Sequence, residues 1–339
     1  MRKAGFYMML VIFGPTVSGK TSLAITLAKK FNGEIISADS RQIYKSLDIG
    51  TGKIPFESKF EKHDNYWIVD GIKINGFDIL DPQKSFSSAD FKNFASPIIN
   101  NLQDQNILPV VAGGSGFYIK TLLSNYSTFG ILQNPKLRKE LEKKSAGELY
   151  DELLKINKIK ALSLNDSDKK NPRRLIRAIE VTSYQSIPKN PTTNHQPFIL
   201  PKEGPTTNIL MIGLNAPNSY LFGKADDWLD LRLKKGLIEE VDALLTQKIT
   251  SAWLDSLGLE YRWISRYLLN KIDKDTAIER LKGDIHSLIR RQKTYFSQFK
   301  DINIYDVSRK GWERDLENEV TAWNKKQMET RRYKCLGRE

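Results

Sequence analysis

The segment Gly-Pro-Thr-Val-Ser-Gly-Lys-Thr at residues 14–21 constrains the fold of this 339-residue chain more than any other. It fits the pattern G-x-x-x-x-G-K-[ST], in which a glycine-rich loop between a strand and a helix surrounds phosphate oxygens with backbone N–H groups. An apolar run at 8–13 and helically spaced apolar residues at 22–30 supply those two elements. We therefore expect a polyphosphate site. Its candidate ligands are Gly14, Pro15, Thr16, Val17, Ser18, Gly19, Lys20 and Thr21, the last through a Mg²⁺ ion.

Strands and helices alternate over the first 123 residues, which is typical of a parallel sheet covered by helices. After the phosphate loop, the pattern predicts in order a strand, a helix, a strand and a helix at 34–36, 90–102, 107–112 and 117–123. The predicted fold is α/β, a P-loop NTPase-like doubly wound parallel sheet with a helical insertion domain. We divide the chain into a core (1–123), a helical insertion (124–198), a return to the core with C-terminal helices (199–315) and a frayed polar tail (316–339).

The charge balance indicates a polyanionic partner. Lysine and arginine total 53 against 40 aspartate and glutamate, a formal net charge of +13. A basic surface attracts nucleic-acid phosphates, although a charge that only keeps the protein in solution is the alternative. The single cysteine, Cys335, argues against a disulfide framework or a zinc cluster and fits the cytoplasm. No segment has the roughly 20 apolar residues that cross a bilayer, so we expect no membrane contact.

One carboxylate is placed for chemistry beside the phosphate loop. Asp39 follows the predicted strand at 34–36, and the carboxyl ends of parallel strands share one edge of a sheet. This position suits a general base acting on a nucleophile, but also a helix N-cap or a Mg²⁺-shell carboxylate. The strand at 107–112 ends without the aspartate that holds magnesium in P-loop energy converters. That absence argues against the alternative of a P-loop kinase acting on a small molecule.

At this point the sequence resembles a known family, the bacterial-type tRNA dimethylallyltransferases, also called tRNA isopentenyltransferases or IPP transferases. The matching segments follow in order over most of the chain, at 14–21, 36–53, 86–91, 111–120, 173–180, 236–241 and 290–296. The resemblance implies an enzyme that binds dimethylallyl diphosphate with Mg²⁺. It would transfer the five-carbon group to the exocyclic N6 amine of the adenosine just 3′ of the anticodon in tRNA. We expect such a protein to act as a monomer.

The resemblance also implies roles for individual residues. The phosphate loop would hold the diphosphate leaving group, with Lys20 and a Mg²⁺ ion on Thr21 neutralising its charge. Asp39 would accept the proton of the attacking amine, and Ser115 matches a family threonine that hydrogen-bonds near the bridging oxygen. The target base must leave the anticodon-loop stack to reach these groups. The segment that matches the channel for this base comprises Asp39, Ser40, Arg41 and Gln42.

A basic cluster in the predicted insertion is the main candidate for contacts with tRNA phosphates. Arg173, Arg174 and Arg177 fall on one face of a helix by their spacing. A solvated helix face is the alternative, but the cluster matches a tRNA-contacting segment of the family. Further candidates for the anticodon stem-loop are Arg262, Arg290, Arg291 and Gln292.

Two positions depart from the family pattern. Trp228 stands eight residues before Gly236, where most members have an arginine that contacts the diphosphate, and His286 stands where an arginine is common. Tryptophan cannot reproduce the bidentate grip of a guanidinium. Either Arg232, one helical turn further on, binds the diphosphate instead, or the chain is a catalytically weak tRNA-binding homologue.

Overall fold

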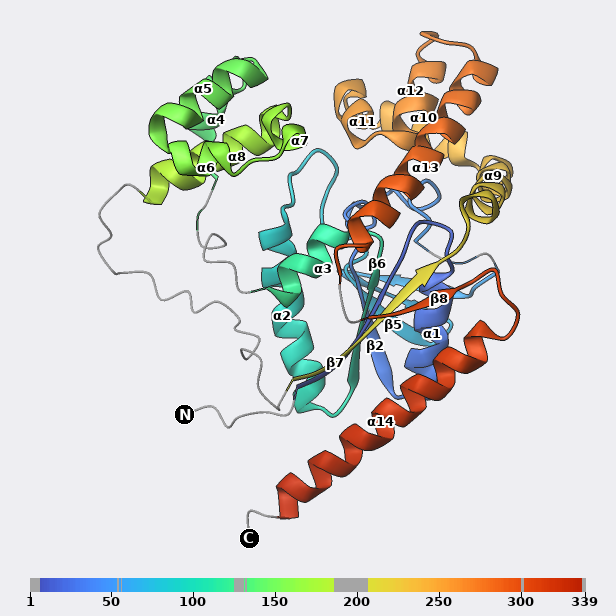
Figure 1. Cartoon of the computed structure of the whole chain (residues 1–339). Coiled ribbons are helices and arrows are strands. Elements are labelled where there is room, and N and C mark those ends of the chain that lie inside the picture. The colour runs from blue at the N-terminus through green and yellow to red at the C-terminus, as the bar shows by residue number, and fades with distance from the viewer. Residues whose placement is uncertain are drawn as a thin grey trace. The chain divides into compact units, whose positions relative to one another are not determined.

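The structure is a computed structural model of the chain and describes residues 7–53, 55, 57–124, 131, 133–185, 207–299 and 302–336 (Figure 1). The chain divides into two compact units. Residues 1–124 and 200–339 form the first unit, which holds the sheet, and residues 125–199 form the second, whose described elements are helices. The predicted α/β fold with a helical insertion is confirmed.

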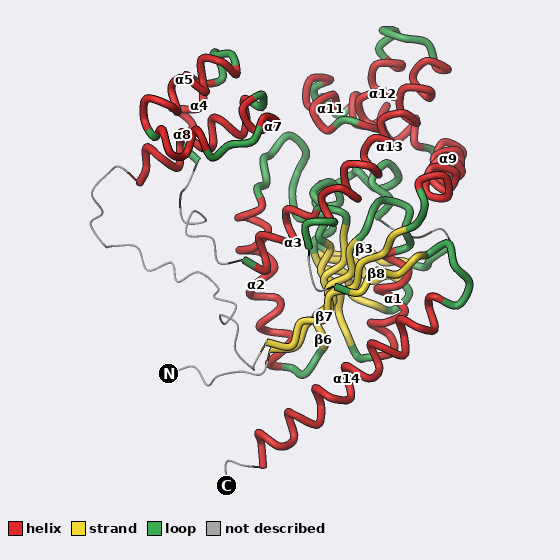
Figure 2. The backbone as a smooth tube through the Cα atoms, viewed as in Figure 1, coloured by secondary structure: helices red, strands yellow, loops and turns green. Residues whose placement is uncertain are grey.

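The strands of the described residues form one sheet of eight (Figure 2). Its order is β3–β4–β5–β2–β6–β1–β7–β8. The two pairs that involve β4 are antiparallel, and all other neighbouring pairs are parallel. The strands are β1 Tyr7–Phe13, β2 Gly33–Ser37, β3 Phe60–His63, β4 Tyr66–Val69, β5 Ile72–Asn75, β6 Leu108–Gly113, β7 Thr207–Asn215 and β8 Asn303–Asp306.

Strand β1 shows how the sheet is covered on both faces. Leu10 and Ile12 pack into one buried cluster, and Met9, Val11 and Phe13 pack into another, because successive side chains of a strand point to opposite faces. Helices cover both faces, and two pairs of them pack along the strands (Figure 1). The first pair is α1 Lys20–Lys30 and α14 Trp312–Leu336, and the second is α2 Ser88–Asp104 and α3 Gly116–Leu123.

Helix α13 connects the C-terminal helices to the sheet. It packs against α9 and α12, and its last turn reaches β1, where the rings of Phe296 and Phe13 are 4.9 Å apart between centroids. The residues just before Phe296 therefore lie beside the phosphate loop. The helices of this region are α9 Asn218–Lys234, α10 Leu237–Thr246, α11 Ser251–Leu257, α12 Leu259–Leu268 and α13 Lys274–Phe296.

The C-terminal segment differs from the expected frayed polar tail. It forms α14, in which Leu316 and Val320 are fully buried against the core. These residues are four apart and share one face, so a narrow apolar stripe is enough to dock an otherwise polar helix. The sequence does not predict β3, β4, β5 or β8 either, because strands of four residues carry little periodic signal. No helix in the described ranges, α14 included, is long and apolar enough to cross a membrane.

The second unit is a small helical bundle with its own core, in which Leu149 and Leu175 are fully buried. Its helices are α4 Pro135–Leu141, α5 Ala146–Ile156, α6 Lys158–Leu162, α7 Asp166–Lys169 and α8 Pro172–Gln185. The buried carboxylate of Glu180 on α8 accepts two hydrogen bonds from Arg138, at 2.7 and 2.8 Å, and one from Arg177 at 3.3 Å. Such a bidentate pair fixes α4 against α8.

Candidate active site

Three loops meet at one edge of the sheet because β2, β6 and β1 are parallel neighbours. The register pairs Ser37 with Ala112 and Phe13 with Gly113, so the three strands end at the same level. Gly113 has to be glycine, since a Cβ there would lie 2.1 Å from the carbonyl oxygen of Ala38. The phosphate loop, residues 39–42 and residues 113–116 therefore face one another where α/β sheets bind their ligands.

The phosphate loop has a backbone suited to anion binding. Gly19 is left-handed, with φ 84°, immediately before α1 begins at Lys20, and the first N–H groups of a helix lack intrahelical acceptors. The Nζ atom of Lys20 donates to the carbonyl oxygen of Pro15 at 2.6 Å. Loss of hydration lowers the pKa of Lys20 to about 8, although the nearby charge of Asp39 acts in the opposite direction.

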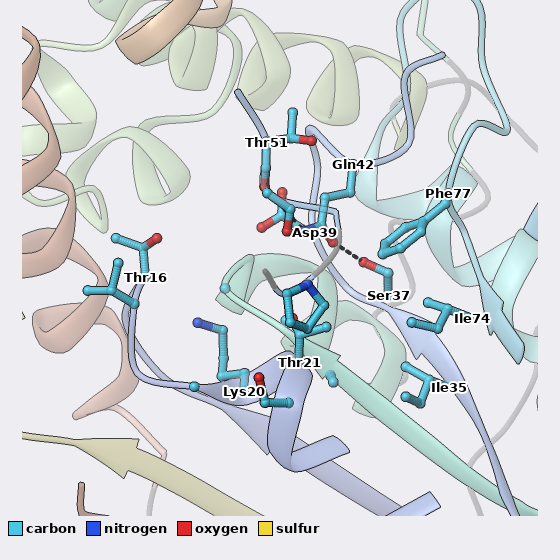
Figure 3. A pocket seen from close by; sticks show the side chains of 18 of the residues that line it. Thr16, Lys20, Thr21, Ile35, Ser37, Asp39, Gln42, Thr51, Ile74 and Phe77 are labelled. Atoms are coloured by element: carbon cyan, nitrogen blue, oxygen red, sulfur yellow. Dashed lines mark hydrogen bonds between the residues drawn. The ribbon is translucent and has the colours of Figure 1, made fainter. Parts of the chain in front are cut away.

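A cavity of about 300 Å³ adjoins this loop (Figure 3). Its polar lining includes Lys20 and Asp39, whereas Ile35, Ile74 and Phe77 supply an apolar lining. In Figure 3 the three apolar side chains lie together, on the side of the cavity away from Lys20. The lining therefore matches a ligand with an anionic end and a short apolar end.

A second cavity, of about 200 Å³, shares part of this lining. Thr16, Lys20, Asp39 and Trp228 border both cavities, so the two spaces adjoin. Asp39 thus stands where they meet. The polar and charged residues that line only the second cavity are Ser40, Arg41, Ser115, Arg232, Glu260 and Gln292.

Hydrogen bonds within and between these loops hold Asp39 and Ser115 in place. The Oδ1 atom of Asp39 accepts from the backbone N–H of Arg41 at 3.0 Å. The hydroxyl of Ser115 accepts from the backbone N–H of Ser40 at 3.0 Å and lies 3.2 Å from the hydroxyl of Ser40. A carboxylate and a hydroxyl are therefore oriented at one edge of the sheet, and the carboxylate is partly exposed.

The surroundings of Thr21 suit a magnesium ligand. Its side chain lines the first cavity together with Asp39, so a hydroxyl and a carboxylate border the same space. Magnesium prefers oxygen ligands and often binds through substrate phosphates and water. The residues present therefore fit a Mg²⁺ ion that accompanies a diphosphate. Among the described residues, no group of three His, Cys, Asp or Glu side chains is arranged to hold a metal by itself.

Two glutamines that the sequence assigns to tRNA binding have partners within the chain. The Gln42 amide accepts from the Ser37 hydroxyl at 2.7 Å and donates to the carbonyl oxygen of Gly52 at 3.1 Å. Gln292 on α13 accepts from the backbone N–H of Thr16 at 2.8 Å and donates to the carbonyl oxygen of Gly114 at 3.0 Å. Gln292 therefore joins the phosphate loop to the loop after β6.

Arg232 reaches the site from α9, as the sequence-based alternative for the missing family arginine requires. Its side chain is 2 % exposed, and Nη1 donates to the carbonyl oxygen of Gly50 at 2.7 Å and to Glu260 at 2.8 Å. The guanidinium stacks on Trp228, with Cζ 2.9 Å from the ring centroid. Burial lowers the pKa of Arg232 to about 10, which leaves it charged at neutral pH. Trp228 therefore contacts the arginine that stands near the site.

The other arginines predicted on the first unit have different surroundings. Arg291 is exposed on α13, and Arg290 lies 5.3 Å from the ring centroid of Phe222. Arg262 is half-buried and pairs with Asp255 and Asp284 at 3.9 and 3.6 Å. His286, at the second departure from the family pattern, hydrogen-bonds to Asp226 at 3.0 Å.

In the second unit the basic cluster is less uniform than its spacing suggests. Arg173 and Arg174 are exposed, and Arg174 pairs with Asp168. Arg177 is partly buried and hydrogen-bonds to Glu180 and to the carbonyl oxygen of Ile131 at 2.8 Å. Its guanidinium therefore takes part in the packing of the unit.

Two glutamates that organise the site do not stand out in the sequence. Glu240 accepts hydrogen bonds from three backbone N–H groups, those of Asp48, Ile49 and Gly50, at 2.6 to 2.9 Å. Glu260 pairs with Arg232 and is 3 % exposed. A glutamate within a helix is usually on a solvated face. The only signal for Glu260 is its position between two apolar residues.

The fold and the site define a class, an α/β protein with a phosphate loop that faces a carboxylate and an apolar wall. The chain belongs to the IPP transferase family, because the model of that family matches residues 42–299. It is 38 % identical over 310 residues to the tRNA dimethylallyltransferase of Acetivibrio thermocellus, covering 91 % of this chain and 93 % of the relative. It is 33 % identical over 316 residues to the protein of the same name from Thermomicrobium roseum, covering 92 % and 90 %.

Solved structures agree with this assignment. The tRNA isopentenylpyrophosphate transferase of Bacillus halodurans matches with a TM-score of 0.67 and 28 % identity, over 96 % of this chain and 99 % of that chain. A eukaryotic dimethylallyltransferase acting on tRNA has a TM-score of 0.68 over 88 % of this chain and 74 % of its own. At 24 % identity this second likeness concerns the fold alone. The family predicted from the sequence motifs is confirmed.

Proposed function

We propose that this protein transfers a dimethylallyl group from dimethylallyl diphosphate to the N6 amine of the adenosine 3′-adjacent to the anticodon in tRNA. The observation that carries this proposal is a single carboxylate, Asp39, at the junction of two cavities. One cavity has the anionic and apolar linings that a short prenyl diphosphate needs. The other has polar residues together with Trp228, Leu259 and Ile285 in its lining, a mixture that suits a nucleobase. The curated relatives, named tRNA dimethylallyltransferases, support the same reaction.

The prenyl donor would lie along the first cavity. Its diphosphate would bind the N–H groups of residues 14–21, the ammonium of Lys20 and, at the border of the second cavity, the guanidinium of Arg232. Its five-carbon group would contact Ile35, Ile74 and Phe77, since burying an apolar group against these side chains is favourable. A phosphorylated sugar or nucleoside would bring hydroxyls to this apolar wall, where they lack partners.

Magnesium would be held by the donor phosphates and the hydroxyl of Thr21, with Asp39 close enough to share its water shell. When bound, the ion neutralises charge on the departing diphosphate. Lys20 and Arg232 are the protein's own cations for the same purpose, because charge that develops in the transition state is stabilised by groups already in place.

The transfer itself exchanges two bonds at one carbon. The lone pair of the adenine N6 attacks C1 of the dimethylallyl group, and the C1–O bond breaks with its electrons leaving on diphosphate. The nitrogen then sheds one proton, which Asp39 accepts. We assign the hydroxyl of Ser115 to a hydrogen bond near the bridging oxygen, because it lies at the same edge beside residue 40. The products are the N6-prenylated base and diphosphate.

The acceptor base would enter the second cavity after leaving its stack. Ser40 and Arg41 lie at its border, and Gln42 supports the loop that carries them. The tRNA phosphates would contact the remaining basic residues, and we propose a single copy of the chain, acting in the cytoplasm, as the functional unit. The proposed phosphate contacts are Arg173, Arg174 and Arg177 on α8, Arg262 on α12, and Arg291 with the adjacent Gln292 on α13.

Incubation with bulk tRNA and either labelled dimethylallyl diphosphate or γ-labelled ATP tests the proposal. We expect label from the prenyl donor to appear in tRNA and no label from ATP in tRNA or in small molecules. Label from ATP in a small molecule would instead support a kinase. Binding of tRNA without any transfer would support a catalytically weak homologue.

A further inference from the structure

Glu260 stands between two of the cations at the second cavity. Its Oε1 atom accepts from Nη1 of Arg232 at 2.8 Å, and its Oε2 atom accepts from Nη1 of Arg41 at 3.4 Å. The side chains of Glu260 and Arg232 are 4 % and 2 % exposed, whereas that of Arg41 is 25 % exposed. The stronger of the two contacts is therefore the buried one. Glu260 lies on α12, so it connects α9 to the loop that carries Asp39.

Arg232 is held on several sides but not fully satisfied. Gly50 and Glu260 both accept from Nη1, and Trp228 covers one face of the guanidinium. The Nε and Nη2 atoms are buried and have no hydrogen-bond partner among the described residues. Buried donors without acceptors are costly and rare in folded proteins. An anion in the adjoining cavity would supply the missing acceptors.

The neighbouring loop is shaped around this arginine. Gly52 has φ 60°, and a Cβ there would lie 2.3 Å from Nη2 of Arg232 and 2.5 Å from the ring of Trp228. The loop is anchored by Glu240, which accepts from the N–H of Gly50, the residue whose carbonyl oxygen faces Arg232. The guanidinium is therefore enclosed by the loop at Gly52, by Glu260 and by Trp228, and does not lie on an open surface.

The charges at the cavity show why a carboxylate is needed there. Arg41 and Arg232 carry like charges, and the field of Arg41 contributes to lowering the pKa of Arg232. Without Glu260 the two guanidiniums would repel each other, and Arg232 would lose the carboxylate that lies 2.8 Å from it, its one ion-pair partner among the described residues. With Glu260 present, Nη1 of Arg232 is fixed, while Nε and Nη2 have no hydrogen-bond partner among the described residues.

We propose that Glu260 is a positioning residue for prenyl transfer: it holds the guanidinium of Arg232 so that the Nε and Nη2 edge meets the departing diphosphate. This inference rests on the proposed function, because it assumes that the anion is the diphosphate of the prenyl donor. Trp228 serves the same end by stacking on the guanidinium. Trp228, at the family's arginine position, and Arg232, one helical turn further on, then act together to place a single guanidinium.

Orientation and charge predict different outcomes when Glu260 is replaced. Glu260→Gln removes a negative charge beside a bound anion, so the affinity for diphosphate should stay within about threefold or increase. The rate of transfer should fall about 10- to 100-fold, because a misplaced guanidinium stabilises the charge that develops on the leaving group less well. A merely structural glutamate would not separate these two quantities.

The test measures single-turnover transfer from labelled dimethylallyl diphosphate to an anticodon stem-loop, with the full-length protein in excess, and the affinity for inorganic diphosphate with Mg²⁺. The variants are Glu260→Gln, Arg232→Met and the double variant, and the matched control is Glu239→Gln, an exposed position on α10. A single-turnover rate constant does not depend on the fraction of inactive protein. The double variant should be no more than about threefold slower than Arg232→Met, since Glu260 acts through Arg232.

Three results would overturn the inference. A Glu260→Gln rate within about threefold of wild type would remove its role, and multiplicative losses in the double variant would show that it acts elsewhere. If Lys20→Ala and Asp39→Asn lose transfer while Glu260→Gln does not, the proposed function stands and only this inference fails. If the unaltered protein transfers no prenyl group, both fail.

Discussion

The surroundings of Lys20 make the charged form of its side chain less stable than it is in water. Because its pKa is lowered to about 8, the side chain is a cation at pH 7 and becomes neutral as the pH rises through 8. A diphosphate binds the cation better, so the advantage of wild type over Lys20→Ala should be largest at pH 7. It should shrink by up to about tenfold per unit above pH 8. Titration calorimetry with inorganic diphosphate at pH 7 to 9.5 measures it. An affinity ratio that does not change with pH would remove Lys20 from the anion site.

Asp39 is the residue on which the proposed chemistry depends most. Its Oδ1 atom is held by the N–H of Arg41, and asparagine preserves that hydrogen bond while losing the ability to accept a proton. Asp39→Asn should therefore slow single-turnover transfer by ~10²–10⁴-fold and leave tRNA affinity within a few-fold. A variant that keeps more than about a third of the wild-type rate would show that another group takes the proton.

Trp228 and Arg232 raise the question of whether the missing family arginine limits the enzyme. The stack of the two side chains and the burial of Arg232 favour compensation from the next helical turn. We expect Trp228→Arg to bring no gain in single-turnover rate, because a second guanidinium would lie against the first. Arg232→Met should cost at least about tenfold, since it removes a preorganised cation. A faster Trp228→Arg together with a neutral Arg232→Met would reverse this assignment.

Helix α8 offers a prediction at the scale of an element. Arg173 and Arg174 are exposed on it, whereas Arg177 is bound to Glu180. Replacing Arg173 and Arg174 with alanine should weaken tRNA binding and reduce the slope of log affinity against log salt by about 0.7 for each lost phosphate contact. Binding measured between low and moderate salt gives the slope. If the slope of the variant equals that of the wild type, Arg173 and Arg174 lie on a solvated helix face and do not contact phosphates.

The elements at the carboxyl edge of the sheet are those that the sequence could predict. The run before Gly14 and the one before Gly113 are long, apolar and followed by glycine-rich loops, so strand, loop and following helix are all signalled locally. The four-residue strands β3, β4, β5 and β8 carry no comparable signal. Helix α14 is missed because two buried residues, Leu316 and Val320, dock a long polar segment.

The residues of the candidate site also fall into two groups, those that the sequence could predict and those that it could not. Lys20 and Asp39 follow strands that the sequence reveals, so their proximity could be inferred from the rule that parallel strands end at one edge. Glu260 and Arg232 come from helices α12 and α9, whose packing depends on contacts far apart in the chain. No local pattern reports such contacts. The hydrogen bonds by which Gln42 and Gln292 connect separate loops could not be predicted for the same reason.

At the scale of the whole molecule, the proposed reaction joins a small donor to a large polyanionic acceptor. The proposed donor site lies entirely in the first unit, where the phosphate loop, the apolar wall and Asp39 border adjoining cavities. The acceptor explains the formal charge of +13, which a small-molecule kinase does not require. We therefore expect one adenosine amine and one allylic carbon to meet at Asp39.

The most direct measurement is prenyl transfer to anticodon stem-loops that differ only in the base 3′ of the anticodon. With labelled dimethylallyl diphosphate and Mg²⁺, the account predicts label in the adenosine stem-loop, located to that nucleoside by mass spectrometry. A stem-loop with inosine at that position, which has no exocyclic amine, should receive none. Equal labelling of both stem-loops, or no labelling of either, would contradict the account.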